Sequence, residues 1–175
     1  MPRITGGTCR GRRLEVADGT RPTTELARKA AFDILGDAIR GARVLDACAG
    51  SGAYGLEALS RGAAHATFVE EDLKVAEILR GNVERLGAGE RSTLEATPVD
   101  RFSSKVNEPR SFDVIFHDPP FEEISDSDLR LLVPLVRPGG WLFHERGDDR
   151  VLAPGGLAPA DVRRYGHTRL LIYRP

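Results

Sequence analysis

The sequence predicts an α/β fold with a mostly parallel sheet that ends in an antiparallel hairpin. From residue 42 onward, short apolar segments of strand length alternate with segments of helical periodicity. This alternation is typical of a parallel sheet covered by helices on both faces. Near the C-terminus, segments 161–165 and 169–174 surround Gly166 and His167 with no helix between them. We therefore expect an antiparallel hairpin at one edge of the sheet.

The same patterns place the individual elements. The expected strands are 43–48, 66–70, 92–96, 112–117 and 141–145, and the expected helices are 54–60, 73–86, 99–106 and 126–136. Before them, Pro22 ends an extended segment, and Thr23 or Thr24 can cap a helix that runs to about residue 39. The apolar side of that helix is expected to carry Leu26, Ala30, Ile34 and Leu35.

The N-terminal residues differ from the rest in pattern and charge. Segments 3–5 and 13–16 read as two short strands around a glycine-rich turn. Residues 1–30 carry a net charge of +4 and the remainder a net charge of −5. A basic segment on an acidic body is typical of a protein that binds a polyanion at one end, although a solvated basic face gives the same pattern. We expect an arm over residues 1–22, followed by one compact domain over residues 23–175.

Composition limits the class of protein. With 175 residues, 41% of them hydrophobic and 29% charged, the chain fits one globular domain. It has neither an apolar run of the roughly 20 residues that cross a membrane nor a signal-peptide core. Two cysteines make no disulfide framework, so a cytoplasmic setting is expected. His65, His144 and His167 lie at no metal-ligand spacing with these cysteines, so we expect no metal site. A monomer is the default expectation.

A glycine-rich loop follows the first expected strand of the main domain. Gly50, Gly52 and Gly55 satisfy the G-x-G-x-x-G pattern of dinucleotide sites. Asp46, however, stands four residues before the first glycine, where a carboxylate would repel a pyrophosphate. It suits S-adenosylmethionine, whose amino and sulfonium groups are cationic. Glu70, at the end of the next expected strand, can accept hydrogen bonds from ribose hydroxyls, which both kinds of cofactor contain.

An Asp-Pro-Pro-Phe turn follows the expected strand 112–117, which should lie beside strand 43–48. Consecutive Pro119 and Pro120 fix the backbone near Asp118. The Asp118 carboxylate and the Pro119 carbonyl can accept the two hydrogens of an exocyclic amine, which directs the nitrogen lone pair toward a methyl donor. Phe121 offers a flat face for an extruded base. These residues predict methylation of a nucleobase amino group.

The first residue of that turn indicates which base is recognised. Guanine presents a ring N–H beside its amino group, and a carboxylate accepts from both. Adenine presents a donor beside an acceptor, which suits Asn better than Asp118. The sequence therefore favours guanine.

The most specific motifs extend over nearly the whole chain. They are Arg3-Ile4-x-Gly6-Gly7, Arg10-Gly11-Arg12, Arg21-Pro22-Thr23, Asp46-x-x-Ala49-Gly50-Ser51-Gly52, Gly55-Leu56-Glu57-Ala58-Leu59-Ser60-Arg61-Gly62, Glu70 and Asp118-Pro119-Pro120-Phe121. With these motifs the chain resembles the bacterial 16S ribosomal RNA guanine-N2 methyltransferases of the RsmD type.

The resemblance implies a Rossmann-like class I methyltransferase fold with seven strands and an N-terminal β-hairpin that helps to bind RNA. It implies S-adenosylmethionine as methyl donor, S-adenosylhomocysteine as product, and a guanosine of 16S rRNA in a partly assembled small ribosomal subunit as substrate. The implied cofactor residues are Asp46, Ala49, Gly50, Ser51, Gly52 and Glu70. Asp118, Pro119, Pro120 and Phe121 would hold the base. Arg3, Arg10, Arg12, Arg13, Arg21 and Thr23 would bind RNA.

One pair departs from the family pattern. Thr97-Pro98 stands where the family usually has Asp or Asn followed by a small residue that contacts adenine. Pro98 has no backbone N–H to donate, and Thr97 is a weaker partner for the adenine amine.

Four alternatives remain open at this point. An adenine amino group in DNA or RNA and, more distantly, a protein glutamine amide are rival methyl acceptors. A dinucleotide-dependent oxidoreductase fits Gly50 to Gly55 but leaves Asp118 to Phe121 without a purpose. A non-catalytic RNA-binding assembly factor fits the basic arm but requires neither Glu70 nor Asp118.

Overall fold

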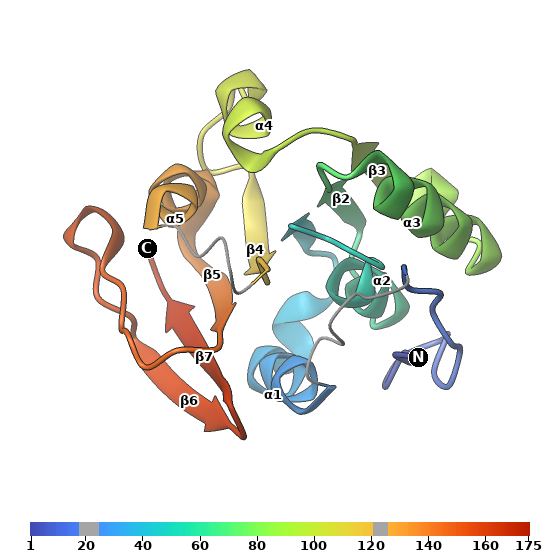
Figure 1. Cartoon of the computed structure of the whole chain (residues 1–175), viewed down its shortest axis with the longest axis horizontal. Helices are drawn as coiled ribbons and strands as arrows, with labels where there is room; N and C mark the ends of the chain where they lie inside the picture. Colours follow the sequence, from blue (N-terminus) through green and yellow to red (C-terminus); the bar gives the residue numbers. More distant parts are fainter. Residues whose placement is uncertain (18–24, 121–125) are drawn as a thin grey trace.

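The computed structural model describes residues 1–17, 25–120 and 126–175. Its centre is a seven-stranded sheet of order β3-β2-β1-β4-β5-β7-β6, which Figure 1 shows fanning across the molecule. The first five strands run parallel, whereas β7 pairs with β5 and β6 in antiparallel fashion. The predicted α/β class and the antiparallel C-terminal hairpin are therefore confirmed.

The strands and helices lie close to their expected positions. The strands are β1 (Arg43–Ala47), β2 (His65–Val69), β3 (Ser92–Glu95), β4 (Phe112–His117), β5 (Val136–Arg146), β6 (Asp161–Tyr165) and β7 (Thr168–Tyr173). The α-helices are α1 (Glu25–Leu35), α2 (Ala53–Ser60), α3 (Leu73–Arg85), α4 (Val99–Lys105) and α5 (Asp126–Leu132).

Two apolar clusters cover the two faces of the sheet. Val44 of β1 and Val114 of β4 belong to the cluster that contains buried residues of α1, α2 and α3. Their neighbours Leu45 and Ile115 belong to the other cluster, which contains residues of α4 and α5. Because successive strand residues point to opposite faces, this alternation places three helices on one face and two on the other.

The buried side of α1 was predicted correctly at Leu35 but not at the other three positions. Leu26 is 66% exposed, and Ala30 and Ile34 are only partly buried. The buried residues of α1 are Ala27, Arg28, Ala31, Phe32 and Leu35. The buried face lies about one residue further along than expected and includes the fully buried side chain of Arg28. After Leu35 the chain continues as a 3₁₀ turn to Ile39, and the expected caps Thr23 and Thr24 lie outside the described residues.

The expected helix 126–136 also ends too late. α5 ends at Leu132, a short 3₁₀ turn covers Val133–Leu135, and Val136 already pairs with Phe112 as the first residue of β5. Pro134 explains the end of the helix, because proline lacks the N–H that an α-helix needs in its interior.

The N-terminal arm packs against the main domain. Instead of two strands, residues 3–5 and 13–16 form a single antiparallel bridge between Arg3 and Arg13. Ile4 and Leu14 are buried in the cluster on the α1–α3 face, so folding of the arm is coupled to that core. Figure 1 shows this segment against α2 and α3. In the described ranges, no helix is long and apolar enough to cross a membrane.

Candidate active site at the carboxyl ends of β1 and β4

The strand order changes direction between β1 and β4. These two strands lie side by side, with Ala47 opposite His117 in the register. The next residues, Cys48 and Asp118, therefore leave the sheet at the same edge. In open α/β sheets ligands bind at this position, beyond the carboxyl ends of the strands where the order reverses.

The glycine loop between β1 and α2 is held in left-handed backbone conformations. The φ angles are 60° at Cys48, 54° at Gly50 and 80° at Gly52. A Cβ on Gly52 would lie 2.4 Å from Leu79, so glycine is required there by space as well as by φ. A Cβ on Gly50 would meet no described atom within 4 Å. The Gly50 backbone is therefore accessible to a ligand.

Two carboxyl side chains accept hydrogen bonds from backbone amides of this loop and of the helix that follows it. A buried Asp46 oxygen accepts a hydrogen bond of 2.8 Å from the Gly55 amide at the start of α2. Glu70 accepts from the Gly50 amide at 2.8 Å and from the Asp72 amide at 3.0 Å. Burial raises the pKa of Asp46 well above its ordinary value, and Asp118 and Glu70 raise it further. Asp46 and Glu70 thus place two carboxyl groups directly beneath the loop backbone.

The Asp118 turn faces this negative region. Asp118 is half-buried, Pro119 is buried and Pro120 is exposed, while Phe121 lies outside the described residues. The charge of Asp118 contributes to raising the pKa of Asp46 and of Tyr54, for both of which burial is the largest cause. The structure thus brings the glycine loop, Glu70 and the Asp118 turn to one edge of the sheet, as the sequence predicted.

The other expected cofactor residues flank this centre. Ala49 donates to the Val69 carbonyl at 2.9 Å, which ties the loop to β2, and Ser51 is half-buried in the loop. Thr97 is buried after β3, with its amide bonded to the Glu95 carbonyl at 3.0 Å. Pro98 stands at the N-cap of α4. The contact of this pair with adenine stays a prediction.

The arm presents its arginines to the surface. Arg3, Arg10, Arg12 and Arg13 are all exposed, and Arg12 donates to the Arg85 carbonyl at 2.9 Å. Arg21 and Thr23 lie outside the described residues. The arginine side chains are thus available to a polyanion while the apolar side of the arm is buried.

A buried ionic network under the arm was not anticipated from the sequence. Glu57 of α2 accepts from the amide and hydroxyl of Thr5 at 2.7 and 2.8 Å and pairs with Arg61 at 2.7 Å. Arg28, whose side chain is 0% exposed, lies 3.9 Å from Glu57 and donates to the Arg3 carbonyl. Glu57 and Arg61 belong to a recognised motif, but nothing in the pattern indicated that they hold the arm.

Asn82 of α3 links the arm to the glycine loop and was also missed. Its side-chain amide donates to the carbonyls of Glu15 and Ser51, both at 2.9 Å, and its carbonyl accepts from the Glu15 amide at 2.9 Å. Asn82 is buried. One side chain therefore connects the arm directly to the glycine loop.

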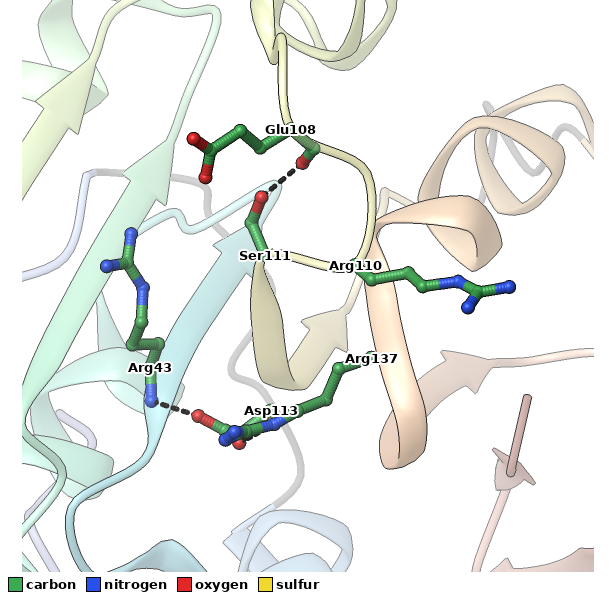
Figure 2. Close-up of a pocket in the computed structure, with 6 residues that line it drawn as sticks. All are labelled: Arg43, Glu108, Arg110, Ser111, Asp113 and Arg137. Atoms are coloured by element: carbon green, nitrogen blue, oxygen red, sulfur yellow. Dashed lines mark hydrogen bonds and ion pairs between the residues drawn. The ribbon is translucent and has the colours of Figure 1, made fainter.

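A cavity of about 270 Å³ lies at the opposite end of the sheet. Figure 2 shows its lining, in which the Arg43 amide donates to Asp113 at 2.7 Å and Arg137 pairs with the same carboxylate. These residues lie at the amino ends of β1, β4 and β5, away from the edge at which ligands of open α/β sheets bind.

Comparison with known proteins agrees with this architecture. The family model "Conserved hypothetical protein 95" matches residues 2–174. The "Ribosomal RNA small subunit methyltransferase D" of Escherichia coli K12 is 41% identical over 145 residues, covering 82% of this chain and 70% of that protein. The same-named protein of Haemophilus influenzae is 34% identical, over 86% of this chain and 81% of that protein.

Solved structures show the same fold. A hypothetical protein from Thermus thermophilus superposes with a TM-score of 0.86 at 34% identity over the whole of both chains. An RNA methyltransferase from Salinibacter ruber, solved with S-adenosyl-L-homocysteine, gives a TM-score of 0.67 at 15% identity, over 87% of this chain and 92% of that chain. The resemblance to RsmD-type enzymes is thereby confirmed, and the chain belongs to the Conserved hypothetical protein 95 family, which it shares with the small-subunit ribosomal RNA methyltransferases D.

Proposed function

We propose that this protein transfers a methyl group from S-adenosylmethionine to the exocyclic amino group of a guanine in 16S rRNA of the small ribosomal subunit. The observation that carries the proposal is the adjacency of the Asp118-Pro119 turn and the glycine loop at the end of the neighbouring strands β1 and β4. Family membership favours a methyltransferase over a dinucleotide oxidoreductase or a non-catalytic assembly factor.

The residues present fit the cofactor. Gly50 has open space above its backbone, and the carboxyl groups of Asp46, Glu70 and Asp118 lie close to one another beside the loop. Such a site attracts a cationic amino acid group and repels a pyrophosphate. Glu70 would accept from ribose hydroxyls in place of the Gly50 amide, with Ala49, Ser51 and Gly52 lining the loop and Thr97 and Pro98 beside the adenine. When bound, S-adenosylmethionine supplies an electrophilic methyl group.

The chain itself would supply positioning and electrostatic stabilisation. The Asp118 carboxylate and the Pro119 carbonyl accept the amine hydrogens, which orients the nitrogen lone pair and stabilises the positive charge that develops on nitrogen. Asp118 also accepts from the neighbouring ring N–H of guanine. Pro120 keeps this turn rigid, and Phe121 stacks on the base.

RNA binding would involve the exposed side of the arm. Arg3, Arg10, Arg12 and Arg13 would contact phosphates, and Arg21 and Thr23 would line the substrate side of the pocket. We place the reaction in the cytoplasm, with the protein acting as a monomer on an assembled or partly assembled small subunit.

The decisive experiment measures transfer of labelled methyl groups from S-adenosylmethionine to small ribosomal subunits that lack this modification. Nucleoside analysis is expected to place the label in N2-methylguanosine. Label in N6-methyladenosine would replace guanine by adenine and keep the mechanism. An absence of both label and cofactor binding by calorimetry would overturn the proposal.

A second experiment tests the role of the arm. Replacing Arg10, Arg12 and Arg13 by Ala is expected to reduce the slope of log K against log salt by about 0.7 for each lost phosphate contact on single-stranded RNA. A triple replacement of exposed arginines elsewhere, Arg80, Arg101 and Arg150, is the matched control. Equal changes in both triple variants would show that only net charge matters.

A further inference from the structure

A second cluster of polar side chains lies at the edge of the candidate active site. Cys48 follows β1, His117 ends β4 and Asp128 lies in the first turn of α5. Their potential ligand atoms all lie within 4.8 Å of one another. The three residues are 69 and 11 positions apart in sequence, so only the fold brings them together.

His117 shows that this cluster lacks a binding partner. Its side chain is 1% exposed, yet neither ring nitrogen has a hydrogen-bond partner among the described residues. Its Nε2 lies 3.6 Å from an Asp128 oxygen, which is too long for a hydrogen bond. Buried polar atoms are nearly always satisfied. An additional atom between His117 Nε2 and the Asp128 carboxylate would satisfy that buried nitrogen.

The separation fits two ligands of one metal ion. In a tetrahedral zinc site, bonds of about 2.1 Å to nitrogen and oxygen place these ligand atoms about 3.4 Å apart. A thiolate, an imidazole and a carboxylate are all zinc ligands, and three protein ligands with one open position form a complete coordination set when water takes the fourth.

The backbone and the local charge agree with a cation. Cys48 holds a left-handed conformation, with φ of 60°, which is strained for a non-glycine residue, and such strained residues cluster at functional sites. Asp128, Glu70, Asp118 and Asp46 all act electrostatically on Cys48. A dication would offset this excess of negative charge.

We propose that Cys48, His117 and Asp128 bind a divalent metal ion of the zinc class, distinct from the cofactor and base sites. On binding, the Cys48 thiol releases its proton to solvent and the sulfur bonds to the metal, so one proton leaves for each ion bound. The ion would link the end of β1, the end of β4 and α5. It would thereby fix the glycine loop relative to the Asp118 turn.

Cobalt(II) provides a direct probe. Addition of Co²⁺ alone to the purified chain is expected to produce a sulfur-to-cobalt charge-transfer band at one ion per chain, and Zn²⁺ is expected to abolish it. Cys48→Ser should remove the band. His117→Gln and Asp128→Asn should each weaken Co²⁺ binding by about 10-fold or more. The matched controls are Cys9→Ser, which removes the other free cysteine, and His65→Gln, which removes a half-buried histidine at the start of β2.

The variant Cys48→Gly removes the thiol and is expected to fold, because glycine adopts this φ without strain. We expect this variant to be at least as stable as the parent chain without metal, and Zn²⁺ to raise the Tm of the parent but not of the variant. The proposal is overturned if the parent chain gives no cobalt band with excess Co²⁺, if the band survives Cys48→Gly, or if Cys9→Ser removes it.

Discussion

The carboxylates at the two ends of the sheet differ in whether a nearby cationic side chain compensates their charge. At the amino end of β4, Asp113 accepts from the Arg43 amide and pairs with Arg137, so its charge is compensated locally. At the carboxyl end of β1, Asp46 is buried against the Gly55 amide, and Asp118 and Glu70 add to its negative surroundings. The interactions of Asp113 at the amino end thus stabilise the fold without a bound ligand. The carboxyl end retains a negative potential that a cationic ligand would neutralise.

The largest expected effect concerns turnover at the carboxyl end. Asp118→Ala removes one of the two acceptors for the amine, and we expect kcat to fall by about 10²–10³-fold, as after the loss of one oxyanion-hole donor. RNA affinity and Tm should change little, because Asp118 is half-buried and lies outside the apolar clusters. Single-turnover methyl transfer to small subunits measures kcat, and a filter-binding assay measures RNA affinity.

The variant Asp118→Asn gives a more specific test. It keeps the size and shape of the side chain but replaces one accepting carboxylate oxygen by a donating NH2 group. Guanine methylation should fall in this variant almost as far as in Asp118→Ala. Full activity of the Asn variant would contradict the role given to the carboxylate, and a gain of adenine methylation would point to the other base.

The next effect tests the amino end. Asp113→Ala leaves Arg137 without its carboxylate and the Arg43 amide without its acceptor. Because both arginines are partly or largely exposed, we expect a loss of only about 1–2 kcal/mol in the free energy of unfolding. Urea unfolding measures this loss, while methyl transfer by the folded fraction should stay within twofold of the parent. A large loss of activity without a loss of stability would break the comparison between the two ends.

Much of this architecture was predictable from local sequence patterns. The strands alternate with helices at short spacing, and a parallel arrangement requires the crossover helices that the pattern shows. The position of β4 beside β1 followed from the same topology, and the register confirms it. The errors are local. Arg28 looks like a surface residue of α1 because arginine is rarely buried, and only its contacts with Arg3 and Glu57 in three dimensions explain its position.

The candidate site was predictable only where its residues occur in short motifs. The Asp46 to Gly55 and Asp118 to Phe121 segments are contiguous, so their chemistry is visible in the sequence. The links that Asn82 makes between Glu15 and Ser51 join three distant segments, and no spacing rule indicates them. The two arm segments bond to each other over only a short stretch, and the Thr5, Cys9 and Glu15 amides bond to α2 and α3 instead, so a single bridge replaces the expected two strands.

A smaller effect of opposite sign is expected at Asp46. In Asp46→Asn the side-chain oxygen can still accept from the Gly55 amide, but the buried charge is gone. We expect the ligand-free protein to gain about 1 kcal/mol in the free energy of unfolding, since uncompensated buried charge is unfavourable. Affinity for S-adenosylmethionine should fall by about 10-fold, equivalent to a similar energy. Urea unfolding measures the change in stability, and calorimetry measures the affinity for S-adenosylmethionine. A destabilised variant with unchanged affinity would contradict this prediction.

The smallest expected effect concerns Asp148, which also lies beyond the carboxyl end of a strand, β5, but has its charge compensated by arginines. It tests whether local compensation, rather than location at this end of the sheet, decides how a carboxylate affects stability. Arg146 and Arg150 bond to its carboxylate, and the hydrogen bond from Arg146 is the main reason that the pKa of Asp148 lies well below its ordinary value. A lowered folded-state pKa adds stability above the unfolded-state value of about 3.9, and this stability is lost as the pH falls below it. Asp148 is partly exposed but Arg146 is fully buried, so Asp148→Asn should lose about 1 kcal/mol at pH 7. The free energies of unfolding of the parent and of Asp148→Asn should become equal as the pH is lowered below about 4. A difference that persists in acid would mean that packing of Asp148, rather than its charge, matters at this end of the sheet.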